Sequence, residues 1–162
     1  MPYPTQDRIK ELLHYCPHTG RFTWIKARGN KASGSPAGYT DPKGYVYIAI
    51  DKKDYAAHRL AWIYTHGVEP QDEIDHKNHV KDDNRIDNLR PATHAQNCAH
   101  RRIRKDNFVG YKGVQLYRGK YASRITVNGR QRRLGTFNTP EEAYIAYLAA
   151  AQDAFGKFHH PG

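Results

Sequence analysis

The 162-residue chain can bury one ordinary hydrophobic core or two small ones. Its hydrophobic content of 38% is low for a single tightly packed domain. No apolar run approaches the roughly 18 residues of a membrane span, and the N-terminus has no apolar signal-peptide segment. We therefore expect a soluble cytoplasmic protein without a membrane partner. Cys16 and Cys98 are far apart in the sequence, which predicts free thiols in a reducing compartment.

The net charge of +10 comes from one part of the chain. Residues 101–133 contain eleven Lys and Arg and one acid, Asp106, whereas the rest carries fifteen of each sign. A solvated surface usually mixes both signs, so this one-sided block indicates a polyanionic partner. Glycines, tyrosines and β-branched residues interrupt the block, which favours a folded surface over a disordered tail. No basic helix with a bulky apolar face is visible, so nucleic acid is favoured over a membrane surface.

The first part of the chain predicts a helix and then a hairpin region. Thr5 is a suitable N-cap, and apolar residues at helical spacing continue to Cys16, so we expect the helix to stop at Pro17. The elements expected next are a strand over 21–24, an irregular loop over 26–44, a strand over 44–50 and a helix over 58–66. Gly67 is placed as the C-cap of that helix. We expect this region to be scaffold.

The stretch from Asp72 to Lys105 is rich in polar residues, and its part from Asp72 to Leu89 predicts two short strands joined by a polar loop. Pro91 is expected to end the second strand. Thr93 can cap a following helix that runs to about Arg104. Asn97 would then project from the first turns of this helix, with the side chain of Arg101 one turn further along the same face.

This stretch also holds residues suited to phosphodiester hydrolysis. Asp75 and His76 are adjacent in the sequence. Asn88 lies thirteen residues after Asp75, and Asn97 lies nine residues after Asn88. A neutral histidine can activate the attacking water, and a divalent cation can relieve charge on the phosphate and the leaving oxygen. Carboxylate and amide oxygens are the ligands that Mg²⁺ prefers. Neighbouring side chains of a regular strand point to opposite sides, so a site shared by Asp75 and His76 requires a bent strand or a loop that folds over it.

The last part of the chain predicts a three-stranded sheet and a helix. Strands are expected over 112–116, 121–127 and 132–137, with Asn128-Gly129 as a hairpin turn. The sequence Thr139-Pro140-Glu141-Glu142 supplies an N-cap, a proline at the first helical position and a capping-box glutamate. Small residues then mark one helix face, which suits a helix lying close against the sheet.

Four segments resemble the HNH endonucleases, in particular the phage and intron-encoded homing type: Ala57–Trp62, Ile74–Asn78, Asp83–Arg90 and Gln96–Asn97. The resemblance implies the ββα-metal fold, in which two strands and a helix surround one divalent cation. It places the general base on His76, the metal ligands on Asp75 and Asn97, and the residue that orients the histidine and braces the loop on Asn88. It also implies Mg²⁺ or, alternatively, Mn²⁺, products with 5′-phosphate and 3′-hydroxyl ends, and a bacterial or phage-infected cell.

Residues 107–158 resemble a second family, the AP2 DNA-binding domain. The matching segments are Gly110–Val114, Gly119–Tyr121, Leu134–Phe137, Thr139–Ala143 and Ala146–Tyr147. AP2 domains lay their three-stranded sheet in the major groove, so the resemblance implies a double-stranded DNA partner. Two tryptophans common at that face in plant members are absent. Arg118 and Arg133 stand near their places, and arginine can bind guanine edges or phosphates.

The expected fold class is α+β: a ββα-metal nuclease core followed by a three-stranded antiparallel sheet with a helix. The expected domains are an N-terminal helix and hairpin region over 1–54, the nuclease core over 55–105 and the AP2-like domain over 106–162. DNA contacts are expected at Arg85, Arg101, Arg102, Arg104, Lys105, Lys112, Gln115, Tyr117, Arg118, Arg124 and Arg133.

We predict an HNH endonuclease guided by an AP2-like module and acting as a monomer or a DNA-bridged dimer. Two alternatives are a DNA-binding regulator whose nuclease fold is inactive, and a zinc-stabilised binding protein without catalysis. The zinc would be held by His79, His94, Cys98 and His100, whose spacing is irregular. The set of Asp75, His76 and Asn97 favours the nuclease over the regulator, which has no need of all three.

Overall fold

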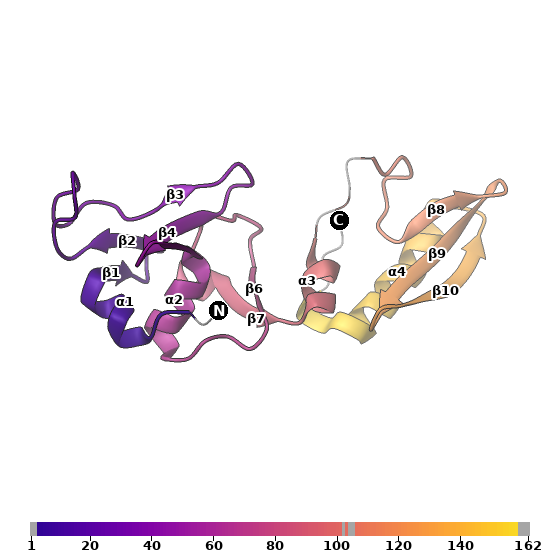
Figure 1. The fold of residues 1–162 in the computed structure, drawn as a ribbon. Helices are drawn as coiled ribbons and strands as arrows, with labels where there is room; N and C mark the ends of the chain where they lie inside the picture. The colour runs from indigo at the N-terminus through magenta and orange to yellow at the C-terminus, as the bar shows by residue number, and fades with distance from the viewer. Residues whose placement is uncertain (1–2, 102, 104–105, 159–162) are drawn as a thin grey trace. The chain divides into compact units, whose positions relative to one another are not determined.

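The computed structural model describes residues 3–101, 103 and 106–158 (Figure 1). The chain divides into two compact units, Met1–Pro91 and Ala92–Gly162, and each is described by itself. Both units mix helices with strands that pair locally, so the fold class is α+β, as predicted. The division falls inside the segment 55–105 that the sequence assigns to a nuclease core, and the expected domain limits stay a prediction.

The first unit is built from short helices and small sheets. Its helices are α1 (Gln6–Leu12) and α2 (Ala57–His66). Its strands are β1 (Leu13–Cys16) paired with β2 (Arg21–Trp24), β3 (Tyr39–Thr40), β4 (Val46–Ile50) and β5 (Lys53–Ala56) in that order, and β6 (Glu73–His76) paired with β7 (Leu89–Ala92). A 3-10 helix, η1 (Ile86–Asn88), comes directly before β7.

The N-terminal helix is shorter than its sequence predicts. It ends at Leu12, and the expected last turn is instead β1, in which Leu13 and Tyr15 are buried while His14 between them is exposed. This alternation is the burial pattern of a strand. The ring of Tyr15 packs on Phe22 of β2 with 4.7 Å between centroids, so cross-strand packing outweighs the helical spacing of the apolar residues.

The core of the first unit lies between these small elements. Its largest fully buried apolar side chains come from α1, β1, β4 and α2: Ile9, Leu13, Ile48, Ile50 and Leu60. Helix α2 ends as predicted at Gly67, whose φ of +78° suits glycine and whose N–H binds the carbonyl of Ile63. Figure 1 shows α1 and α2 in the same part of the first unit, where they contact each other.

The β6–β7 pair confirms the two predicted strands and differs in one detail. Pro91 lies within β7 and does not end the strand. A proline is tolerated there because the pair has only two strands, so each has one edge outside the ladder. The residues between β6 and η1 form the polar loop that the sequence predicts, and His79 in this loop has a positive φ of 63°.

The second unit contains α3 (His94–His100), β8 (Val114–Tyr117), β9 (Lys120–Val127), β10 (Arg130–Phe137), α4 (Pro140–Phe155) and the 3-10 helix η2 (Gly156–Phe158). The three strands form an antiparallel sheet with β9 in the centre, as expected. Helix α3 begins with the predicted Thr93 cap but ends at His100, before the expected Arg104. Arg102, Arg104 and Lys105 lie outside the described residues.

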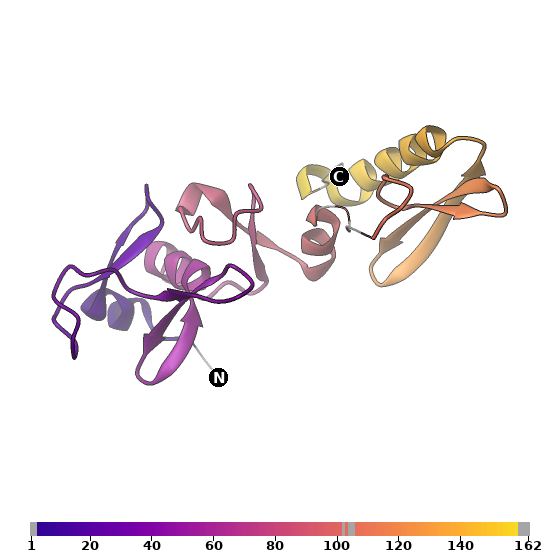
Figure 2. The same ribbon diagram turned by 90° about the horizontal axis from the view of Figure 1, so that it is seen from above.

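Helix α4 covers one face of this sheet (Figure 2). Its buried side chains pack with Ile125 of β9 to form the core of the unit: Tyr147, Ala150, Ala151 and Phe155. The approach is close at Gly113, where a Cβ atom would lie 2.1 Å from the Tyr147 ring. The capping box predicted at Thr139 and Glu142 is present, so the start of α4 is confirmed.

Candidate active site

Strand β6 places Asp75 and His76 in buried surroundings, and each is 6% exposed. The Asp75 carboxylate accepts a hydrogen bond from Arg90 Nε of β7 at 2.8 Å, and this ion pair is itself buried. The His76 ring has other partners, because its Nε2 lies 3.2 Å from Asn84 Oδ1 and its ring lies 5.2 Å from that of His58. Residues 73–76 form a continuous strand, so the two side chains have different partners, as strand alternation predicts.

Asn88 braces the loop between β6 and η1. Its Oδ1 accepts from the backbone N–H of Asn78 at 3.1 Å, and its Nδ2 donates to the carbonyl of Asp83 at 2.8 Å. The backbone N–H of Lys77 also donates to the Asn88 carbonyl at 2.9 Å. One buried asparagine therefore joins both ends of the loop, and its role in the reaction stays a prediction.

The hydrogen bond to the His76 ring comes from Asn84, a residue that sequence reasoning missed. Asn84 is 2% exposed, and its Nδ2 donates to the Asp82 carbonyl at 3.3 Å, which turns Oδ1 toward the histidine. With this acceptor, Nε2 of a neutral His76 carries the proton and Nδ1 is the basic nitrogen. Asn84 lies in the segment Asp83–Arg90 that resembles the HNH endonucleases, but a polar loop such as Asp82–Arg85 is normally exposed, so its burial was not expected.

Burial keeps both histidines of the site neutral near pH 7. It lowers the pKa of His76, although the hydrogen bond with Asn84 and the charge of Asp75 act in the opposite direction. Burial also lowers the pKa of His58 to about 3, and the neighbouring His76 and Arg59 contribute in the same direction. A neutral imidazole can accept a proton, so His76 has the protonation state that a general base needs.

The predicted metal ligands are divided between the two units. Asp75 is in the first unit, whereas Asn97 is in α3 of the second, so their joint site stays a prediction. Carboxylate and amide oxygens fit a hard divalent cation in kind. Among the described residues, no three His, Cys, Asp or Glu side chains are grouped so that they could hold a metal ion. His94 Nε2 and Cys98 Sγ, two residues of the alternative zinc set, lie 3.5 Å apart along α3.

The expected DNA-contacting residues have different surroundings. Arg85 is half exposed but is paired with Asp83 at 2.6 Å. Arg101 is the C-cap residue of α3. The ammonium of Lys112 donates to the carbonyls of Ala99 and, at 2.6 Å, Arg101, and its expected DNA contact stays a prediction. Burial lowers its pKa to about 8, so Lys112 closes the end of α3 and is not a freely exposed cation.

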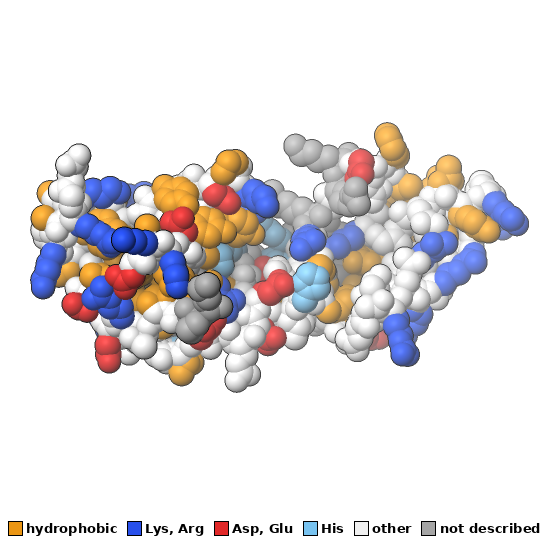
Figure 3. Space-filling view, in the orientation of Figure 1, with side chains coloured by type: hydrophobic (Ala, Val, Ile, Leu, Met, Phe, Trp, Pro, Cys, Tyr) orange, Lys and Arg blue, Asp and Glu red, His pale blue; other side chains and the backbone are white. Residues whose placement is uncertain are grey.

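The remaining expected residues lie on the three-stranded sheet, and several of them are neighbours. Arg124 and Arg133 are directly opposite each other on β9 and β10. The guanidinium groups of Arg118 and Arg133 lie 5.4 Å and 5.6 Å from the centre of the Tyr117 ring. Gln131, which was not predicted, accepts from Arg124 at 3.4 Å, and Gln115 is exposed on β8. Figure 3 shows Lys and Arg side chains along this part of the chain.

Comparison with known proteins finds one family whose model matches part of the chain. Residues 55–99 match the model of a family described as HNH endonuclease, and this segment contains the His76 pair, the braced loop and most of α3. This part of the chain is therefore similar to HNH endonucleases. No helix among the residues that the structure describes is long and apolar enough to cross a membrane.

A particular relative extends the similarity beyond that segment. The chain is 31% identical over 128 residues to an uncharacterized HNH endonuclease of Acanthamoeba polyphaga mimivirus. The aligned part covers 76% of this chain and 65% of the relative, so the chain spans less than two thirds of that protein. No solved structure matches.

Proposed function

We propose that the protein is a metal-dependent endonuclease that hydrolyses phosphodiester bonds in double-stranded DNA. The observation that carries this proposal is the His76–Asn84 pair at the end of β6, in which a buried neutral imidazole is oriented by one hydrogen bond. The HNH match over residues 55–99 and the name of the viral relative support the same reaction. The duplex would contact the chain through the basic surface of the second unit.

In the proposed mechanism, His76 acts as the general base. Nδ1 takes a proton from the water that attacks phosphorus, while Asn84 holds the ring through Nε2. Asn88 keeps the loop in place during this step. Asp75 and Asn97 would hold Mg²⁺ or Mn²⁺, which relieves charge on the phosphate and the leaving 3′ oxygen when bound. The resemblance to HNH enzymes implies products with 5′-phosphate and 3′-hydroxyl ends.

The second unit would direct the nuclease to DNA as an AP2-like module. Its sheet and covering helix have the element order that this resemblance implies. The cross-strand pair of Arg124 and Arg133, together with Tyr117 and Arg118, provides cations beside an aromatic ring on neighbouring strands. Such groups bind phosphates and base edges. A phage or intron-encoded homing endonuclease of a bacterial cell fits this combination.

A second candidate function is a DNA-binding regulator without nuclease activity. The buried ion pair between Asp75 and Arg90 favours it, because a guanidinium 2.8 Å away competes with a cation for this carboxylate. The buried, neutral and oriented His76 favours the enzyme, since a regulator does not need a histidine that can accept a proton from water.

Incubation with supercoiled plasmid separates the two functions. The nuclease is expected to convert the plasmid with Mg²⁺ and not with EDTA, giving nicked circles from a monomer or linear DNA from a DNA-bridged dimer. His76→Ala should abolish cleavage while duplex binding is kept, and His14→Ala, at an exposed position of β1, is the matched control. Binding without cleavage by the wild-type protein would establish the regulator instead.

A further inference from the structure

Two hydrogen bonds join the loop that carries Asn84 to the N-terminal part of the first unit, and each is made with a residue far away in the sequence. Tyr15 Oη donates to the Asn84 carbonyl at 2.7 Å, across 69 positions of the chain. Lys81 Nζ donates to the Lys43 carbonyl at 2.8 Å, across 38 positions. The bonds of Asn88 are made within the loop and its ends, so they fix its shape. The two distant bonds fix the loop to the rest of the unit.

Tyr15 is a core residue whose hydroxyl reaches the loop. Its side chain is 3% exposed, and its ring packs on Phe22 and Tyr64 at 4.7 Å and 5.5 Å between centroids. The core therefore determines where the hydroxyl lies. Because both the donor and the Asn84 carbonyl are buried, loss of this hydrogen bond would leave an unsatisfied acceptor beside the site.

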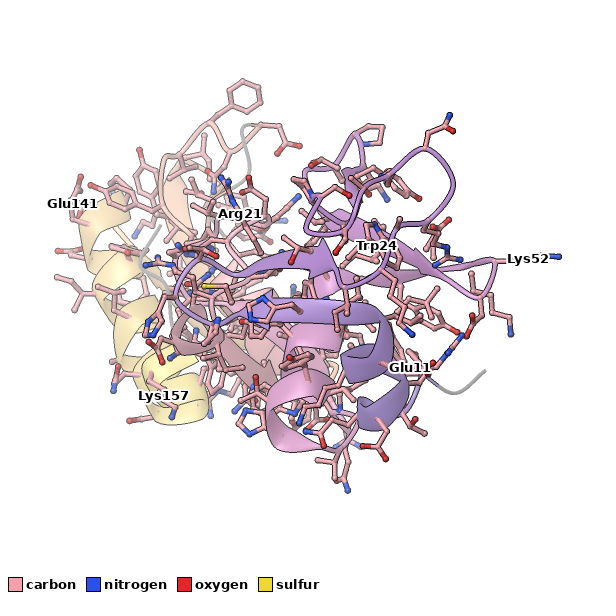
Figure 4. All side chains as sticks on the ribbon, turned by 90° about the vertical axis from the view of Figure 1, so that its left-hand side faces the viewer. Glu11, Arg21, Trp24, Lys52, Glu141 and Lys157 are labelled. Atoms are coloured by element: carbon pink, nitrogen blue, oxygen red, sulfur yellow. The ribbon has the colours of Figure 1, made fainter. Side chains whose placement is uncertain are left out.

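The turn after β1 packs directly against the same residue. Gly20 has a φ of +70°, and a Cβ atom on it would lie 2.4 Å from Arg85 N and 2.5 Å from Asn84 C. Only glycine allows the β1–β2 turn to approach the loop backbone this closely. Figure 4 shows this hairpin, with Arg21 and Trp24 labelled on β2. Asn84 is therefore enclosed by the hairpin as well as bound by Tyr15.

Lys81 fastens the other side of the loop to the turn between β3 and β4. Asp41 Oδ1 builds this turn by accepting from the backbone N–H groups of Lys43 and Tyr45 at 2.9 Å and 2.8 Å. The Lys81 ammonium lies 4.8 Å from the centre of the Tyr45 ring as well as on the Lys43 carbonyl. The Tyr45 ring in turn lies 6.1 Å from that of His76, so this contact reaches the site.

We propose that Tyr15 and Lys81 are positioning residues, which hold Asn84 and, through it, the His76 ring in the orientation needed for proton transfer. The inference rests on the proposed nuclease function and adds a role for the N-terminal region. Its physical basis is that the Asn84–His76 bond joins a loop to a strand, and its geometry depends on where the loop is held. A displacement of about 1 Å at a reacting group can lower a rate by about a hundredfold.

The test uses the full-length protein and single-turnover cleavage of a duplex. Tyr15→Phe removes only the hydroxyl and keeps the packed ring. Its rate of the chemical step should fall by about tenfold or more, with the substrate concentration for half-saturation changed less than about twofold. Tyr64→Phe, which removes a hydroxyl from the ring next to Tyr15, should cleave like the wild type.

Lys81→Met gives an independent test at the loop surface. It should lower the same rate, and Lys81→Arg should restore it, because arginine keeps both the donor and the cation over Tyr45. Lys52→Met is the matched control at the β4–β5 turn, where Figure 4 shows Lys52 pointing away from the unit. Loss of affinity without loss of rate in Lys81→Met would overturn the positioning role, because it would make Lys81 a phosphate contact.

Hydrogen exchange of the amides in residues 77–85 separates this inference from the proposed function. Faster exchange in Tyr15→Phe and Lys81→Met than in their controls supports the fastening even if the wild type fails to cut DNA, in which case only the nuclease function is rejected. Unchanged exchange together with wild-type cleavage in both variants would overturn the inference. Thermal melting of each variant shows whether the whole unit has been destabilised.

Discussion

His58 has surroundings that differ strongly from those of an exposed histidine. It lies on α2 beside His76, and its Nδ1 has no hydrogen-bond partner among the residues that the structure describes. A buried polar atom without a partner costs about 1–3 kcal/mol, and a charged imidazole there would cost more. The site therefore contains a second ring that is neutral over the whole physiological pH range.

The folded first unit should lose stability in acid because of His58. Its folded pKa of about 3 lies below the ordinary value of 6.5, so the unfolded chain binds the proton more tightly. The contribution of His58 is complete above pH 6.5 and is lost as the pH falls from 6.5 toward 3. His58→Gln should reduce the slope of unfolding free energy against pH by up to about 1.4 kcal/mol per pH unit.

Urea unfolding at pH 7, 6, 5 and 4 measures this slope. Tryptophan fluorescence is the suitable signal, because Trp24 and Trp62 both belong to the first unit. His14→Gln, at an exposed position, is the control and should keep the wild-type slope. Equal slopes in wild type and His58→Gln would show that His58 is protonated in the folded unit.

The candidate site was partly predictable from sequence at this scale. Asp75, His76 and Asn88 could be selected because their spacing is that of a known motif, and the structure buries all three. Asn84 could not be selected, because its importance comes from burial under the β1–β2 turn. That contact joins residues more than sixty positions apart, and no local pattern indicates it.

At the scale of elements, Gly113, which comes directly before β8, packs closely against α4 of the second unit. Gly113 combines a φ of +73° with a predicted Cβ position 2.1 Å from Tyr147. Gly113→Ala should destabilise this unit by roughly 2–4 kcal/mol, because a backbone strain adds to a steric overlap. Gly110→Ala has a similar φ of +79° and no neighbouring atom within 4 Å, so it should cost about 1 kcal/mol.

Thermal unfolding followed by far-ultraviolet circular dichroism compares the two variants. The difference between them isolates the steric part, since the backbone strain is common to both. If Gly113→Ala and Gly110→Ala melted at the same temperature, the close approach of α4 to the sheet would be contradicted.

Local signals explain why the elements of the second unit were predicted better than those of the first. Asn128-Gly129 and the Thr139 capping box fix turns and helix starts within a few residues, and both are present. In the first unit, β1 was predicted as helix because Leu12, Leu13 and Cys16 fit helical spacing. This segment is a strand because it pairs with β2. Such pairing depends on two segments, so the spacing of apolar residues in one of them does not predict it.

At the scale of the whole molecule, the two units differ in their net charge. Residues 1–91 carry fourteen Lys and Arg against twelve Asp and Glu, whereas residues 92–162 carry twelve against four. The proposed chemistry depends on buried residues of the first unit, and the electrostatic attraction to DNA should come mainly from the second. Variants on the sheet should therefore change affinity and leave the chemical step unchanged.

The salt dependence of duplex binding tests this division of roles. Each phosphate contact that is lost should reduce the slope of log affinity against log salt concentration by about 0.9. We expect Arg124→Gln and Arg133→Gln each to reduce the slope, because these two cations are directly opposite each other on β9 and β10. Lys52→Met, in the first unit, should keep the wild-type slope. Binding is measured by fluorescence anisotropy in EDTA, and unchanged slopes for both arginine variants would remove this sheet from the DNA interface.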